Sequence, residues 1–164
     1  MKNVIVIMGV SGCGKTSVGE LLSKRLNIPF YDGDNFHPKE NIEKMKINIP
    51  LTDKDRLPWL KKLSKNIKSW KKNEGAILAC SALKESYRKI LNADKSIDYW
   101  VVLNGDCQII YDRISKRKNH FMNPHLLKSQ IEALEVPNYG LHINVSGSLP
   151  EIVNTIIQKI KTNA

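Results

Sequence analysis

Apolar runs and helical patterns alternate along the whole chain. Five short stretches are apolar at nearly every position, which predicts strands that are covered on both faces. Strands of this kind, separated by helices, predict a parallel sheet within one α/β domain over residues 1–164. The five predicted strands are "NVIVIMG", "IPFYD", "AILAC", "DYWVVL" and "LHINV".

The segments between these strands carry apolar residues at the spacing of an amphipathic helix. Pro58 is expected in the first turn of its helix, where a missing N–H leaves no hydrogen bond unmade. Ser148 and Glu151 have the spacing of a capping box at the start of the last helix. We expect helices at 15–26, 38–46, 58–72, 83–91, 106 to about 118, 125–134 and 150–161.

The composition is that of an ordinary globular protein, with 41% hydrophobic and 26% charged residues. The formal net charge is +10, from 26 basic and 16 acidic residues. Such a charge fits either a nucleic-acid-binding surface or a lysine-rich surface around an anion-binding pocket. The second interpretation is favoured, because aromatic residues make up only 7% and do not alternate with the basic ones. We therefore expect no nucleic-acid partner.

The cysteines and the lengths of the apolar runs indicate a cytoplasmic protein without a membrane partner. Cys13, Cys80 and Cys107 are widely spaced, which predicts neither a disulfide framework nor a zinc site. No apolar run approaches the roughly 20 residues of a membrane span. The start "MKNVIVIMG" is too short for a signal peptide.

The stretch "GVSGCGKT" follows the first predicted strand and matches the phosphate-binding pattern G-x-x-x-x-G-K-[ST]. Glycines let backbone N–H groups converge on phosphate oxygens at a helix N-terminus. Lys15 can then reach the β- and γ-phosphates of ATP, and the Thr16 hydroxyl can ligate Mg²⁺. The Cys13 side chain stands where the pattern accepts any residue and receives no role of its own. The expected nucleotide-binding residues of this loop are Gly9, Val10, Ser11, Gly12, Cys13, Gly14, Lys15 and Thr16.

Two aspartates, Asp32 and Asp34, flank a glycine directly after the second predicted strand. Both can point from the strand end toward the phosphate loop. We expect Asp32 to hold the hydrated metal and Asp34 to accept the proton of a substrate hydroxyl. The alternative is a turn with two solvated aspartates. The functional interpretation is favoured because the third and fourth strands, ending in "CSALK" and "LNGD", offer no better metal carboxylate.

Arg113 and Arg117 are four residues apart and so share one face of a predicted helix, just before the polar break "KNHF". Arginines beside such a segment suit a lid that closes over a transferring phosphoryl group. We expect both to bind the nucleotide and Arg117 to take part in catalysis. The alternative is that they are solvated or paired with Asp112.

Five stretches resemble the bacterial gluconokinases, which are P-loop kinases related to shikimate kinase and the nucleoside monophosphate kinases. They are "MGVSGCGKT", "DGDNFHPKENIEKM", "PLTDKDRLPWL", "CSALKESYR" and "RKNHFM". The resemblance implies ATP- and Mg²⁺-dependent phosphorylation of D-gluconate to 6-phospho-D-gluconate, which feeds the pentose phosphate or Entner–Doudoroff route. It also implies the P-loop kinase fold with strand order 2-3-1-4-5, a substrate-binding insertion at about 35–72, a lid at about 113–137 and a homodimer. Asn119 and "LEVP" replace the usual glycine and "LEPP" of that family.

Gluconate carries one carboxylate and several hydroxyls, so its site needs a cation and hydrogen-bonding groups. Arg56 is our first choice for the carboxylate, because arginine offers a bidentate fork and shikimate kinases use an arginine in the comparable region. An ion pair of Arg56 with Asp53 or Asp55 at a helix start is the alternative. The expected substrate-binding residues are Asp34, His37, Arg56, Lys84, Arg88 and His120, and the expected catalytic residues are Lys15, Asp34 and Arg117.

Two other functions compete with gluconate phosphorylation. A shikimate or nucleotide kinase is the rival of the same class, but the glycine triplet expected for shikimate after the third strand is replaced by "CSALK". A nucleic-acid-binding P-loop ATPase is the rival of a different class, and its binding would weaken steeply with salt.

Overall fold

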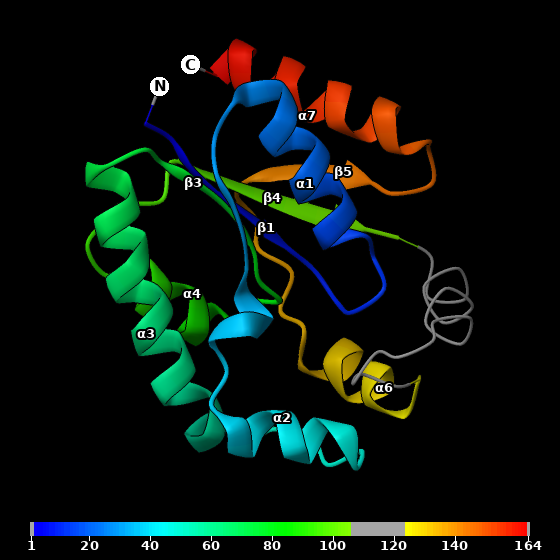
Figure 1. Ribbon diagram of the computed structural model, residues 1–164. Helices are drawn as coiled ribbons and strands as arrows, with labels where there is room; N and C mark the ends of the chain where they lie inside the picture. Colours follow the sequence, from blue (N-terminus) through cyan, green and yellow to red (C-terminus); the bar gives the residue numbers. More distant parts are fainter. Residues whose placement is uncertain (1, 106–123, 164) are drawn as a thin grey trace.

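The computed structural model describes residues 2–105 and 124–163. Its strands are β1 (Val4–Met8), β2 (Phe30–Asp32), β3 (Ala76–Ala79), β4 (Tyr99–Asn104) and β5 (Leu141–Asn144). They form one parallel sheet in the order β2-β3-β1-β4-β5 (Figure 1). This confirms the predicted parallel sheet and the strand order that the family resemblance implied.

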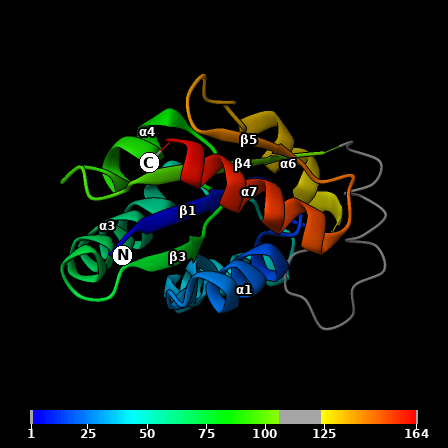
Figure 2. The same ribbon diagram turned by 90° about the horizontal axis from the view of Figure 1, so that it is seen from above.

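Helices cover both faces of this sheet. They are α1 (Lys15–Leu26), α2 (Lys39–Lys46), α3 (Asp53–Lys72), α4 (Glu85–Leu91), α6 (Pro124–Ala133) and α7 (Leu149–Asn163), with a 3₁₀ helix η1 (Gly33–Phe36) after β2. α1 packs with α7 on one face and α3 with α4 on the other (Figures 1 and 2). α2 and α6 lie below the sheet in the view of Figure 1.

The position of β1 at the centre of the sheet explains its uninterrupted apolar pattern. Every β1 side chain is buried, with β3 and β4 paired on either side. Val6, for example, is in register with Leu78 of β3 and Trp100 of β4. A strand covered in this way holds the loop that follows it in a fixed place. In open parallel sheets the ligands bind at this carboxyl edge of the strands.

The start of α3 differs from the prediction. The helix begins at Asp53, five residues before the expected Pro58, so that Pro58 lies inside the helix and not in its first turn. Thr52 and Asp55 form a capping box, in which the Asp55 N–H donates to Thr52 Oγ1 at 3.1 Å and the Thr52 N–H to Asp55 Oδ2 at 2.9 Å. Two backbone donors satisfied in this way stabilise the earlier start.

The capping box predicted for the last helix is confirmed. The Ser148 N–H donates to Glu151 Oε2 and the Glu151 N–H to Ser148 Oγ, each at 3.3 Å. The helix predicted at 106 to about 118 lies outside the described residues. Among the helices of residues 2–105 and 124–163, none has the length and apolar character needed to cross a membrane.

Candidate functional site

One hollow opens where the phosphate loop, the end of β2 and the start of α3 meet. The residues around it come from segments far apart in the sequence. The predicted site residues that the structure brings together here are Ser11, Gly12, Gly14, Lys15, Thr16, Asp32, Asp34, His37 and Arg56.

The phosphate loop runs from the end of β1 into the first turn of α1. Gly14 immediately precedes α1 with φ 95°, a left-handed conformation that glycine adopts without steric cost. A side chain at Gly9 would come within 2.7 Å of Cys13 Sγ, which explains a glycine there as well. Lys15 Nζ bends back over the loop and donates to the carbonyls of Gly9 at 2.9 Å and Val10 at 3.0 Å. Its ammonium group therefore lies on the face of the loop where phosphates would be cradled.

The Asp32 carboxylate joins β2 to the phosphate loop. Its Oδ1 accepts the N–H of Asp34 at 3.0 Å and so caps η1. Its Oδ2 accepts the Thr16 hydroxyl at 3.4 Å. Asp34 lies two residues further on, in the first turn of η1, and lines the same hollow. The two aspartates therefore reach the loop from one short segment, as their spacing predicted.

Trp59 of α3 supports this acidic turn from below. Its indole N–H donates to the Gly33 carbonyl at 2.7 Å, and its ring is almost completely buried. The His37 ring stacks on the indole, with the ring centroids 4.1 Å apart and an interplanar angle of 15°. Trp59 therefore both lines the hollow and positions the turn that carries Asp34.

His37 is held in one orientation and is neutral at pH 7. Burial, together with the positive charge of Arg56, lowers the pKa of His37 to about 4. The Asn41 amide nitrogen lies 3.1 Å from His37 Nδ1, so Nδ1 accepts and Nε2 carries the proton. Nε2 lies 4.0 Å from Asp34 Oδ1. The ring thus presents a hydrogen-bond donor beside the proposed base without adding a charge.

Arg56 lies in the first turns of α3 with its guanidinium group against Tyr87 of α4. Nη1 donates to the Leu51 carbonyl at 2.7 Å and to the Tyr87 hydroxyl at 3.1 Å, and the group lies 5.5 Å from the centre of the Tyr87 ring. The two nearby carboxylates pair with lysines. Lys84 lies 3.1 Å from Asp53, and Lys44 lies 2.9 Å from Asp55. This arrangement argues against the alternative of a helix-start ion pair for Arg56.

Lys84 lines a second hollow, which shares Arg56 with the first. Its ammonium group lies 5.6 Å from the centre of the Tyr87 ring and pairs with Asp53. A hydrogen bond from Tyr87, followed by one from Lys84, lowers the pKa of Asp53. Lys84 is therefore near the site but already has a carboxylate partner.

Arg88 was expected among the substrate-binding residues, but it lines neither of these two hollows. It is buried, and its guanidinium nitrogens donate to the carbonyls of Ala82 at 2.7 Å and Glu135 at 2.7 Å and to the Glu85 carboxylate at 3.0 Å. With its nitrogens bonded inside the protein, it ties the loop after β3 to the segment before β5. Arg88 is a structural residue.

Gln130 of α6 was not predicted as a site residue. Its side-chain oxygen accepts the Ser11 N–H at 2.7 Å in a buried contact that joins α6 to the phosphate loop. Ser129, next to it, lines both hollows. A glutamine on a helix is ordinarily solvated, so only the fold reveals this contact. The predicted site residues Arg113, Arg117 and His120, and also Asn119, lie outside the described residues.

Comparisons with known proteins agree on one family. The family model described as shikimate kinase matches residues 11–161. A probable gluconokinase of Dictyostelium discoideum is 42% identical over 174 residues, covering 98% of this chain and 87% of that protein. The thermosensitive gluconokinase of Escherichia coli (strain K12) is 47% identical over 133 residues, covering 80% and 71%. The crystal structure of a gluconokinase from Sinorhizobium meliloti 1021 superposes with a TM-score of 0.87 at 40% identity, covering 99% of this chain and 94% of that one.

Proposed function

Because this chain belongs to the gluconokinases within the shikimate kinase family of P-loop kinases, we propose that it transfers the γ-phosphoryl group of ATP to D-gluconate. The products are 6-phospho-D-gluconate and ADP. One observation carries the proposal. A phosphate loop, two carboxylates and an arginine held apart from the neighbouring carboxylates line a single hollow.

The phosphate loop supplies the nucleotide side of the site. When ATP binds, the Lys15 ammonium group gives up its hydrogen bonds to the Gly9 and Val10 carbonyls and donates to β- and γ-phosphate oxygens instead. The N–H groups of the loop and the start of α1 add further positive potential. Arg113 and Arg117 complete the charge around the γ-phosphate, a role expected from their spacing on one helix face beside the polar segment "KNHF". The segment at about 113–137 acts as the lid and the segment at about 35–72 as the substrate-binding insertion.

The residues around the loop fit Mg²⁺. Thr16 and Asp32 place a hydroxyl and a carboxylate 3.4 Å apart beside the phosphate loop. Residues 2–105 and 124–163 contain no group of three or more histidine, cysteine, aspartate or glutamate side chains that could hold a metal ion by themselves. Mg²⁺ suits such a place, because it retains several waters and is held by one or two protein oxygens together with substrate phosphates. When bound, the ion neutralises charge on the β- and γ-oxygens.

Asp34 acts as the base for the acceptor hydroxyl. The 6-hydroxyl oxygen of gluconate forms the new bond to the γ-phosphorus, while the bond between that phosphorus and the bridging oxygen of ADP breaks. The hydroxyl proton passes to an Asp34 oxygen late in the reaction, since a loose transition state needs little nucleophilic push. The neutral His37 donates to a substrate hydroxyl beside Asp34.

The Arg56 guanidinium group binds the carboxylate at the other end of gluconate. It is not committed to Asp53 or Asp55, which pair with lysines, so its charge is directed to an external anion. A planar carboxylate fits two parallel N–H groups of arginine. The protein is proposed to act as a homodimer in the cytoplasm, in line with the family resemblance.

The test is ADP release with D-gluconate, shikimate, nucleoside monophosphates and RNA offered in turn, with the sugar phosphate identified by mass spectrometry. We expect gluconate alone to support turnover and to gain one phosphate at the 6-position. Turnover with shikimate or a nucleotide and none with gluconate would overturn the proposal. Stimulation by RNA that disappears with added salt would instead support the nucleic-acid rival.

A further inference from the structure

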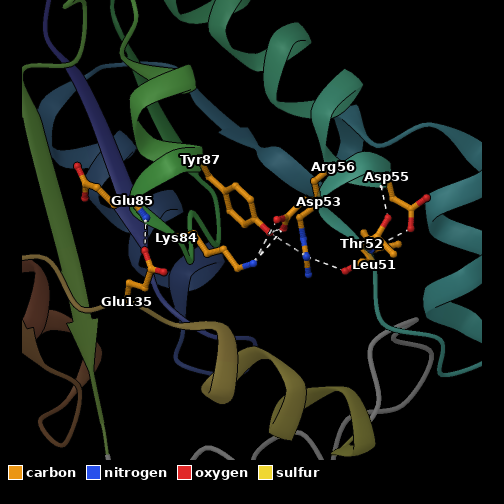
Figure 3. A network of polar contacts seen from close by, with 9 residues as sticks. All are labelled: Leu51, Thr52, Asp53, Asp55, Arg56, Lys84, Glu85, Tyr87 and Glu135. Carbon is orange, nitrogen blue, oxygen red and sulfur yellow. Dashed lines mark hydrogen bonds and ion pairs between the residues drawn. The ribbon is translucent and has the colours of Figure 1, made fainter.

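The Tyr87 hydroxyl lies at the centre of a polar network beside the site (Figure 3). It accepts a hydrogen bond from Arg56 Nη1 at 3.1 Å and donates one to the Asp53 carboxylate. Lys84 pairs with the same carboxylate at 3.1 Å. Arg56 comes from α3 and Tyr87 from α4, two helices that pack against each other.

The direction of each hydrogen bond in this network follows from chemistry. An ionised carboxylate only accepts, so the single hydroxyl proton of Tyr87 points to Asp53. The hydroxyl oxygen is then left to accept from Arg56. Burial and the bond to Asp53 both raise the pKa of Tyr87, so the phenol keeps its proton.

This network determines which edge of Arg56 can meet a ligand. Nη1 carries two N–H groups, one donated to the Leu51 carbonyl and one to the Tyr87 hydroxyl. An incoming carboxylate must therefore be met by Nε and Nη2, which form one parallel pair of donors. Lys84 contributes as well. It neutralises the Asp53 carboxylate, so the positive charge of Arg56 stays available to attract the ligand carboxylate.

We propose that Tyr87 is a positioning residue for the substrate carboxylate, with its hydroxyl fixing the rotation of the Arg56 guanidinium so that the Nε–Nη2 edge faces the hollow. This inference rests on the proposed role of Arg56 in gluconate binding. It makes Tyr87 act on substrate affinity and not on phosphoryl transfer, since the reacting hydroxyl is at the other end of gluconate.

The first test is the variant Tyr87→Phe, which keeps the ring and removes only the hydroxyl. We expect the KM for gluconate to rise about fivefold to tenfold, as for the loss of one ordinary hydrogen bond, because Tyr87 acts on the substrate only through Arg56. The KM for ATP and kcat should stay within about twofold. The control is Tyr139→Phe, which removes another hydroxyl bonded to an arginine, Arg88, away from the site. It should leave the KM for gluconate unchanged.

The second test asks whether Tyr87 acts through Arg56. Arg56→Lys removes the fork, so adding Tyr87→Phe to it should raise the KM for gluconate no further. An additive effect in the double variant, or an unchanged KM in Tyr87→Phe alone, would overturn the inference. An Arg56→Lys enzyme with the wild-type KM for gluconate would instead show that the proposed carboxylate site is wrong. Thermal unfolding of each variant separates these outcomes from loss of folded protein.

Discussion

The Thr16 hydroxyl donates to the Asp32 carboxylate at 3.4 Å, so the first turn of α1 and the end of β2 place a hydroxyl and a carboxylate oxygen side by side. The pair joins residues sixteen positions apart. Asp34, two residues on, is turned into the same hollow by η1. The proposed function gives Asp32 a role at the metal and Asp34 a role as proton acceptor, and the two roles can be tested separately.

The metal pair predicts a shifted magnesium requirement. Asp32→Asn and Thr16→Ala should each raise the Mg²⁺ concentration needed for half-maximal activity, because each removes one ligand of the hydrated ion. Excess Mg²⁺ should restore part of kcat. The measurement is kcat across a Mg²⁺ titration, and an unchanged metal dependence in both variants would contradict the assignment.

Asp34→Asn should lower kcat by about 10²–10⁴, because it preserves the size of the side chain but removes its basicity. ATP binding should stay nearly intact, and excess Mg²⁺ should not restore activity. If Asp34→Asn were restored by metal while Asp32→Asn stayed inactive, the two roles would be exchanged. Activity in both variants would place the base elsewhere.

Lys15→Ala should lower kcat about a hundredfold to a thousandfold, since one charged contact to the transition state contributes roughly 3–4 kcal/mol. Lys24→Ala, in the exposed last turn of the same helix, is the control and should keep normal kinetics. Steady-state assays at saturating ATP distinguish the two. Near-normal kcat in Lys15→Ala would contradict the phosphate-cradle assignment.

Substitution of Arg56 should change the affinity for gluconate, whereas substitution of Arg88 should change the stability of the fold. Arg56→Ala should raise the KM for gluconate about 30- to 150-fold, from the loss of roughly 2–3 kcal/mol of a charge-assisted pair, with little change in the KM for ATP. Arg88→Met should leave the KM for gluconate unchanged but lower the free energy of unfolding by about 3–5 kcal/mol, because several buried acceptors lose their donor. Urea unfolding and kinetics of both variants check this. An equal effect on gluconate and ATP would make Arg56 structural.

The lowered pKa of His37 predicts that the folded protein becomes less stable in mild acid. Its pKa is about 4 in the folded protein, below the ordinary value of 6.5, so below pH 6.5 the unfolded chain takes up a proton that the folded protein does not. Its stabilisation is therefore complete above about pH 6.5 and is lost between pH 6.5 and 4, up to about 3 kcal/mol. His37→Gln should flatten this part of the pH profile in urea unfolding. The exposed His142→Gln is the control and should keep the wild-type slope.

Features that depend on near neighbours were readable from the sequence. The apolar run of β1, the phosphate-loop pattern up to Thr16, and the capping box of Ser148 and Glu151 each involve residues a few positions apart. Their geometry follows from backbone conformation alone, so residue type and spacing were enough. The spacing of Asp32 and Asp34 likewise placed both beside the loop. The start of α3 was missed although Thr52 and Asp55 are close in sequence, because Pro58 looked like the stronger start signal.

Which of the long side chains line the hollow could be seen only in the folded protein. Arg56 and Arg88 both stand in stretches that resemble the gluconokinases. Arg88, however, donates its hydrogen bonds to backbone carbonyls, including that of Glu135, which is 47 residues away in the sequence. Gln130 meets Ser11 across 119 positions of sequence. A flexible side chain of several carbons can reach solvent, a ligand or a buried carbonyl with the same local sequence around it. Its partner is set by which segments the fold brings together, and that depends on packing across the whole domain.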